Sequence, residues 1–201
     1  MITADCAQRL NLGVHMLTLQ QNIEAILEEN RLLLQKIGDE ALQELIESIQ
    51  KARSIFFCAQ GRSGFVLRCF CMRLMHLGYR VYFCGETVTP AIGQEDLLVV
   101  LSGSGTTAST FAAVEIAKAH GATTCGILAH VDSRIAQLLN QKIHLPGTTK
   151  LRLHSEPNSV QMAGSLFEQA SFIFLEAVVL ALYQQHTGTI ESYSGLHTVI
   201  E

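Results

Sequence analysis

A run of five consecutive aliphatic residues, from Leu97 to Leu101, leads directly into the turn Ser102-Gly103-Ser104-Gly105. Unbroken aliphatic runs of this kind are typical of strands that are buried on both faces of a parallel sheet. A helical apolar pattern begins near Thr107, so the segment predicts a buried strand, a glycine-rich turn and a helix. This unit favours an α/β fold in which helices cover both faces of the sheet.

Four further short apolar segments alternate with helical patterns along the chain. The strands are expected at 54–59, 79–84, 123–128 and 142–145. Helices are expected at 65–77, from about 107 to 120, after Asp132-Ser133 and, as a last long helix, over about 163–186. Strands that alternate with helices need crossover connections, which predicts a five-stranded parallel sheet. Ligands bind such sheets beyond the carboxyl ends of the strands, at the topological switch point.

Two helical patterns precede the first strand, at about 5–37, ending at Gly38, and at about 40–52. The long leading helix does not fit the alternating pattern, so we expect it to wrap around the domain or to pair with a second copy. Hydrophobic residues make up 48% of the chain and charged residues 16%, which predicts apolar surface between subunits. We predict one domain over 1–201, with a helical arm over about 1–52, a core over about 53–186 and a tail over 187–201, assembled as a dimer or tetramer.

The composition also excludes several classes of partner. A net charge of -4 with scattered Lys and Arg does not favour nucleic acid or an anionic membrane. The apolar run over 170–183 contains Glu176 and is shorter than the roughly 20 residues that span a bilayer, so it predicts a core helix. No signal peptide is evident, and none of the six cysteines forms a Cys-x-x-Cys pair. We expect a cytoplasmic protein with buried, reduced thiols and no metal site.

The turn after Leu101 has the features of a phosphate site. Gly103 and Gly105 let the backbone approach a ligand closely, while the N–H groups and dipole of the following helix favour an anion. Hydroxyl donors for a phosphate are supplied by Ser102, Ser104 and Thr107. The alternative for the same residues is plain capping of the helix.

A second turn, Gly61-Arg62-Ser63-Gly64, follows the strand at 54–59. It resembles half of a dinucleotide fingerprint, but Gly-x-Gly-x-x-Gly is absent and no acidic residue ends the second strand, which disfavours NAD. Ser63 and the backbone of Gly61 could bind the same anion as the first turn, with Arg62 as a nearby cation. A capped helix start is the alternative. We expect no cofactor.

Four residues are candidates for proton transfer. Glu168 lies in the first turn of the last helix, where a glutamate also interacts favourably with the helix dipole. Glu86 follows the second strand, and Glu156 lies in the loop before the last helix. His197 lies in the tail, where the alternative is a solvated side chain.

Several motifs in order resemble the 6-phospho-3-hexuloisomerases of the sugar isomerase (SIS) domain superfamily. They are Gly61-Arg62-Ser63-Gly64, Met72-Arg73-Leu74-Met75-His76-Leu77-Gly78, Gly85-Glu86 with Thr89-Pro90, Ser102-Gly103-Ser104-Gly105 and Gly164-Ser165-Leu166-Phe167-Glu168-Gln169. The resemblance spans about 54–186. It implies a flavodoxin-like sheet of five strands, a tetramer built from paired dimers, no cofactor, and interconversion of D-arabino-3-hexulose 6-phosphate with fructose 6-phosphate. It also implies that the phosphate is held by Ser63, Ser102, Ser104 and Thr107.

The chain departs from the family pattern at three places. Thr106 stands where the family usually has a glutamate, Ala59-Gln60 replace a glycine-rich pair, and only His197 and Glu201 remain of the closing motif. For the reaction we expect Glu168 or His197 to act as the base, with a second carboxylate, Glu86 or Glu156, orienting hydroxyl groups. The alternatives are an isomerase of the arabinose 5-phosphate type and a sugar-phosphate-binding module without catalytic activity.

Overall fold

The computed structural model describes residues 17–151 and 153–185. Within them, five parallel strands form one sheet in the order β2-β1-β3-β4-β5. The strands are β1 (Ile55–Cys58), β2 (Val81–Phe83), β3 (Leu97–Ser102), β4 (Thr123–Leu128) and β5 (Gln141–His144). This order confirms the predicted five-stranded, flavodoxin-like α/β sheet, and its topological switch point lies between β1 and β3.

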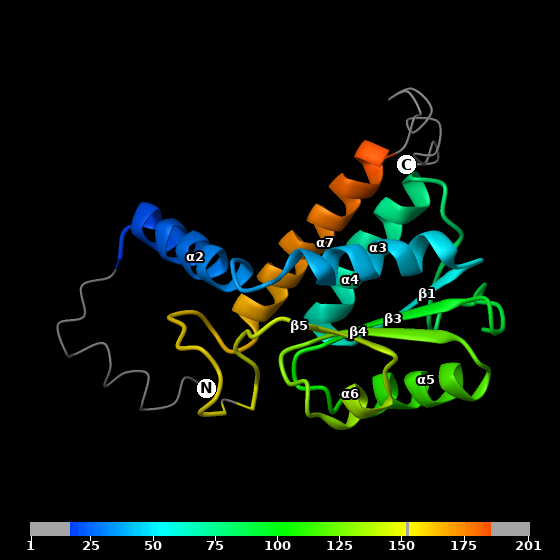
Figure 1. Cartoon of the computed structure of the whole chain (residues 1–201). Coiled ribbons are helices and arrows are strands. Elements are labelled where there is room, and N and C mark those ends of the chain that lie inside the picture. The colour runs from blue at the N-terminus through cyan, green and yellow to red at the C-terminus, as the bar shows by residue number, and fades with distance from the viewer. Residues whose placement is uncertain (1–16, 152, 186–201) are drawn as a thin grey trace.

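Helices cover both faces of the sheet (Figure 1). One face carries α3 (Asp39–Lys51), α4 (Gly61–His76) and α7 (Ser165–Gln185), and the other carries α5 (Ala108–Ala119) and α6 (Arg134–Leu138). Successive residues of a strand point to opposite faces, so Phe57 joins the core under α4 and α7 while Phe56 joins the core under α5. Burial of such a side chain contributes about 1.5–3 kcal/mol to folding.

The helix α2 (Leu19–Leu34) lies outside this layered core and packs on α7 (Figure 1). It begins with a capping box, in which Thr18 Oγ1 accepts the N–H of Gln21 at 3.2 Å. Asn30 Nδ2 then donates to Gln169 Oε1 at 2.8 Å, which ties α2 to α7.

The expectation of one continuous helix over 5–37 is therefore wrong in its described part. Thr18 has an extended backbone and starts a helix at Leu19, and that helix ends at Leu34. Gly38, expected to end it, instead has φ -77° and precedes the first residue of α3. Apolar residues continue at helical spacing beyond Leu34 to Ile37, so the sequence pattern did not show where this helix ends. Residues 5–16 lie outside the described ranges.

The start of α4 also differs from the expectation of a turn over 60–64 and a helix from Phe65. The helix begins at Gly61, after only Ala59 and Gln60 have followed β1. Arg62 and Ser63 consequently lie in its first turn, where the helical backbone fixes the positions of both residues. Helix α5 begins at Ala108 with Thr107 as its N-cap, close to the predicted start.

The expectation that all cysteines are buried is wrong for Cys69, which is exposed on α4. The other cysteines of the described ranges are buried or half-buried free thiols, and Cys6 lies outside those ranges. Helix α7 is long and apolar enough to cross a membrane by length and composition. Eight of its residues are nevertheless buried in this fold, among them Phe167, Phe174 and Leu182.

Candidate functional site

A cavity of about 400 Å³ opens at the carboxyl ends of β1 and β3, where α4, α5 and α7 begin. The two sheet-end segments therefore share one cavity, as predicted for turns that follow strands of one parallel sheet. All seven predicted phosphate-binding residues line it, namely Gly61, Arg62, Ser63, Ser102, Gly103, Ser104 and Thr107. Phe167 and Glu168 of α7 also line it.

Two helix N-termini meet at this cavity. Gln60 is the N-cap of α4 and Thr107 the N-cap of α5, and in the described part of the chain neither side chain caps its own helix. Plain capping therefore does not account for the Thr107 hydroxyl, which lies 3.4 Å from Ser102 Oγ instead. First-turn N–H groups and the positive ends of two helix dipoles create a favourable site for an anion.

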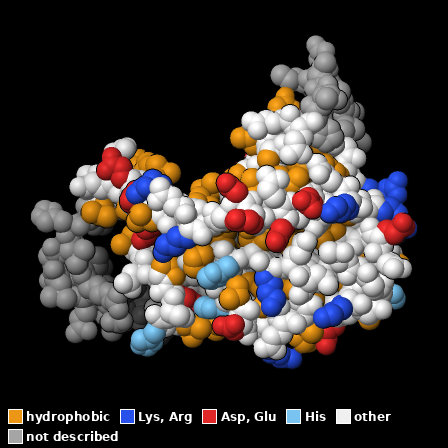
Figure 2. All heavy atoms as spheres, in the orientation of Figure 1, with side chains coloured by type: hydrophobic (Ala, Val, Ile, Leu, Met, Phe, Trp, Pro, Cys, Tyr) orange, Lys and Arg blue, Asp and Glu red, His pale blue; other side chains and the backbone are white. Residues whose placement is uncertain are grey.

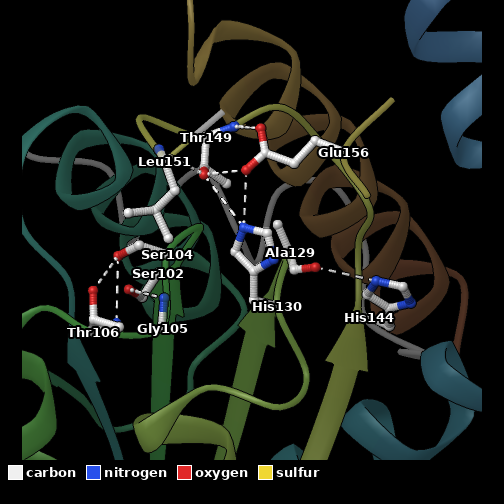
Figure 3. A network of polar contacts seen from close by, with 10 residues as sticks. All are labelled: Ser102, Ser104, Gly105, Thr106, Ala129, His130, His144, Thr149, Leu151 and Glu156. Carbon is white, nitrogen blue, oxygen red and sulfur yellow. Dashed lines mark hydrogen bonds and ion pairs between the residues drawn. The ribbon is translucent and has the colours of Figure 1, made fainter. Parts of the chain in front are cut away.

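Hydroxyl groups of the loop between β3 and α5 form hydrogen bonds within that loop (Figure 3). Ser102 Oγ accepts the N–H of Gly105 at 3.1 Å, and Ser104 Oγ accepts from Thr106 N at 3.3 Å and Thr106 Oγ1 at 3.1 Å. Gly105 has φ +62°, and a Cβ there would lie 1.9 Å from Ser133 Oγ. The loop geometry consequently requires glycine at this position.

Glu168 is the carboxylate that faces this cavity. It lies in the first turn of α7 and forms an ion pair with Arg62 Nε from the first turn of α4. The hydrogen bond from Arg62 raises the pKa of that guanidinium. The Glu168 side chain is 14% exposed and the Arg62 side chain 70%, so the carboxylate is held in the wall while the guanidinium reaches solvent.

The loop after β5 supplies a third wall that the sequence analysis missed. Thr148, Thr149 and Lys150 line the cavity. Two hydroxyls and a lysine following Pro146-Gly147 at the end of the fifth strand were the available signal, because carboxyl ends of parallel strands share one edge. Lys150 gives the cavity a second cation beside Arg62.

Glu156 lies behind this third wall and does not line the cavity itself (Figure 3). Its carboxylate accepts hydrogen bonds from Thr149 N at 2.8 Å and from Thr149 Oγ1, and it lies 2.9 Å from His130 Nε2. The Glu156 side chain is 5% exposed. Burial alone would raise the pKa of Glu156, but the bonds from Thr149 and His130 leave that pKa below its ordinary value. Glu156 therefore shapes the loop that carries Lys150.

Of the two remaining candidates, Glu86 does not line the cavity. Glu86 forms an ion pair with Arg68 at 2.6 Å, and both side chains are about half exposed. Glu86 is thus placed beside the outer face of α4 rather than in the cavity wall. His197 lies outside the described ranges, so its position relative to Glu168 stays a prediction.

Comparison with known proteins shows to which family this chain belongs. Residues 48–180, most of the chain, match the SIS domain. The chain belongs to the SIS domain family. The SIS chain is 38% identical over 180 residues to 3-hexulose-6-phosphate isomerase from Mycobacterium gastri, which covers 90% of each protein. It is 32% identical to 3-hexulose-6-phosphate isomerase from Bacillus subtilis, over 82% of this chain and 89% of the relative.

Solved SIS structures agree with this fold. The crystal structure of a protein from Methanococcus jannaschii, for which a molecular function of 3-hexulose-6-phosphate isomerase was inferred, superposes with a TM-score of 0.77. The two chains are 31% identical, and the match covers 90% of this chain and 99% of the other. The strand order and the surrounding helices are therefore a shared framework.

Proposed function

We propose that this SIS-domain protein is a sugar-phosphate isomerase that interconverts D-arabino-3-hexulose 6-phosphate and fructose 6-phosphate. One cavity carries this proposal: among the described residues, two helix N-termini and two cations surround a single carboxylate there, Glu168. Its support is the identity of 32–38% to proteins named 3-hexulose-6-phosphate isomerase over most of the chain.

The phosphate of the substrate binds at the start of α5 in this proposal. The hydroxyls of Ser102, Ser104 and Thr107 donate to its oxygens, together with Ser63 from α4. Arg62 and Lys150 balance its charge, because hydrogen bonds from cations to phosphate are about twice as strong as neutral ones. Binding energy from this non-reacting group positions the carbons that react.

The carbon skeleton then extends from this phosphate toward Glu168. The Glu168 carboxylate removes the proton from C2 of the 3-ketose, and the electrons move to the C3 oxygen as an enediolate forms. The C2 hydroxyl proton then passes to the C3 oxygen, and Glu168 returns its proton to C3 as the C2 carbonyl of the 2-ketose forms. Arg62 holds the carboxylate in place through their ion pair. His197 is the other candidate for the base or for protonating the oxygens. General acid–base catalysis of this kind is typically worth about 10²–10⁴-fold.

The decisive experiment follows the entry of solvent deuterium into sugar phosphates incubated with the purified protein. Exchange into fructose 6-phosphate, with formation of the 3-ketose, supports the proposal. Exchange only into arabinose 5-phosphate would identify the alternative isomerase. Binding without any exchange would favour a non-catalytic module, the function for which Thr106 in place of the usual glutamate is the specific argument.

We also propose that the protein is a homo-oligomer, a dimer or a tetramer. Helix α2 projects from the layered core in Figure 1, and Figure 2 shows hydrophobic side chains exposed over it. Leu19 is 77% exposed and Leu27 60% exposed, although both lie on a regular helix. Apolar side chains gathered on one helix are typical of a surface covered by a partner.

A further inference from the structure

Two cysteines lie side by side at the edge of the sheet that leads into the cavity. Cys58 is the last residue of β1, and Cys84 directly follows β2. The register pairs Phe57 with Phe83, and Cys84 N donates to Phe57 O at 2.8 Å, so the two cysteines are the next neighbours across the strands. Neighbouring strands lie about 4.7–4.9 Å apart, which falls within the Cα separation of about 4.4–6.8 Å that disulfides require.

Their side chains point to the same face of the sheet. Both belong to the core under α5, next to the contacting rings of Phe56 and Tyr82. The register makes the two thiols neighbours on that face, at the ends of β1 and β2. Cys58 is buried and Cys84 half-buried.

The same contacts distinguish the reactivity of the two thiols. The neighbouring Cys84 thiol lowers the pKa of Cys58, while the Cys58 thiol and burial raise the pKa of Cys84. At two other cysteines burial is the main influence, and it raises the pKa of Cys71 to about 11 and that of Cys125 to about 12. Since the thiolate is the nucleophile, Cys58 is the member of the pair that reacts first.

We propose that Cys58 and Cys84 form a reversible disulfide when a peroxide oxidises the protein, and that this bond weakens sugar-phosphate binding. The Cys58 thiolate attacks the peroxide oxygen, giving a sulfenic acid and, after protonation, one water. The Cys84 thiol then attacks that sulfur, so the S–S bond forms and a second water leaves. The two thiols lose two hydrogens and two electrons in total, and hydrogen peroxide accepts them. A small thiol reverses the bond, as expected for a regulatory disulfide in a reducing compartment.

The consequence for the cavity follows from the chain path, and it rests on the proposed function. Only Ala59 separates Cys58 from Gln60, the N-cap of α4, and residues 60–63 line the cavity. A disulfide brings two Cβ atoms to about 3.5–4.5 Å, closer than adjacent strands are spaced, so closing the bond draws the end of β1 toward β2 within the Cα range that disulfides allow. The backbone has little room to absorb this, because Gly64 lies so close to Ala59 that an added Cβ would be 3.1 Å from Ala59 O. The start of α4 therefore moves with Cys58.

The test compares the full chain before and after treatment with hydrogen peroxide. Remaining thiols are blocked, peptides are mapped by mass spectrometry, and the affinity for fructose 6-phosphate is measured by calorimetry. We expect a Cys58–Cys84 cross-linked peptide and a loss of affinity of about tenfold or more, both reversed by dithiothreitol. Cys58→Ser and Cys84→Ser should bind the sugar phosphate normally and resist peroxide. Cys69→Ser, which removes the exposed thiol on α4, is the matched control and should respond like the wild type.

Three results would overturn the inference: oxidation of Cys58 without a cross-link, a cross-link that leaves the affinity unchanged, or equal peroxide sensitivity in the Cys58→Ser variant. Binding of fructose 6-phosphate to the reduced protein tests the proposed function separately from the disulfide. If the reduced wild type does not bind fructose 6-phosphate, the proposed function fails, whereas the peptide map still decides whether the disulfide forms.

Discussion

Arg62 in the first turn of α4 is ion-paired with Glu168 in the first turn of α7, although 106 positions separate them in the chain. The pair joins the segment after the first strand to the segment after the fifth across one cavity. Its cation faces the proposed phosphate and its carboxylate faces the proposed reacting carbons. One ion pair therefore joins the residue proposed to bind the phosphate to the residue proposed to transfer the proton. Arg62 and Glu168 can be replaced separately to test the two roles.

Replacement of the carboxylate tests the base. Glu168→Gln keeps the size of the side chain but removes the proton acceptor, so we expect the isomerase kcat to fall about 10²–10⁴-fold with nearly unchanged fructose 6-phosphate binding. Glu115→Gln, at an exposed position on α5, is the matched control and should retain full activity. An unchanged rate in Glu168→Gln would move the role of the base to another residue, with His197 the next to test.

Removal of the guanidinium tests the phosphate site. Arg62→Gln deletes one of the two cations in the cavity, and we expect the Kd for fructose 6-phosphate to rise roughly 10- to 100-fold, as for loss of a charge-assisted hydrogen bond. The free energy of unfolding should change by less than about 1 kcal/mol, because the guanidinium is largely exposed. Arg31→Gln removes an exposed arginine that pairs with Glu28 on α2, and its Kd should equal that of the wild type.

A glycine comparison tests the loop geometry. Gly105 and Gly78 both have positive φ, but an added Cβ would collide with Ser133 only at Gly105. Gly78→Ala should therefore lose about 1–2 kcal/mol of stability and keep its sugar-phosphate affinity. Gly105→Ala should lose at least as much stability and also its measurable binding in calorimetry. Normal affinity in Gly105→Ala would show that this loop does not hold the phosphate.

The buried carboxylate behind the third wall predicts a dependence of stability on pH. The folded protein holds the pKa of Glu156 below its ordinary value of 4.5, so the ionised carboxylate stabilises the fold above that pH, and this contribution is lost as pH falls through the lowered pKa. Urea unfolding should show Glu156→Gln to be about 1–3 kcal/mol less stable than the wild type at pH 7. The difference should shrink well below pH 4.5.

The control for that comparison is Glu47→Gln, whose carboxylate is 62% exposed and paired with Lys51. It should change stability by less than about 1 kcal/mol at neutral pH. A difference between Glu156→Gln and the wild type that stays constant down to pH 3 would contradict the assigned role of the Glu156 charge.

The exposed side chains of α2 predict assembly. A Leu19→Ser and Leu27→Ser double variant should lower the oligomeric state measured by sedimentation, since it removes apolar surface from the proposed interface. Val88→Ser changes an equally exposed residue, 82% accessible, in the segment between β2 and β3, and should leave the assembly intact. A wild-type monomer at all concentrations would refute the oligomer outright.

Much of this molecule was accessible from local patterns in the chain. Three features depend on neighbouring residues: the order of helices and strands, the short turn from Leu101 to Thr107 and the first-turn position of Glu168. Strand lengths were less accessible, because β1 and β2 are shorter than the apolar runs at 54–59 and 79–84. Aliphatic runs, glycines and hydroxyls encode such features over a few positions. The start of α4 at Gly61 was missed because a glycine pair is typical of a turn as well as of a helix start.

Contacts between distant segments were decided by the tertiary structure. The sequence by itself determined that two polar turns follow strands of a parallel sheet, and therefore that both turns lie at one edge of that sheet. Only the folded chain paired Arg62 with Glu168. It also formed the hydrogen bond from Thr149 to Glu156 and placed Cys58 beside Cys84. The physical reason is that these contacts depend on the order and register of the strands, which packing of the whole core selects and no local run of residues specifies.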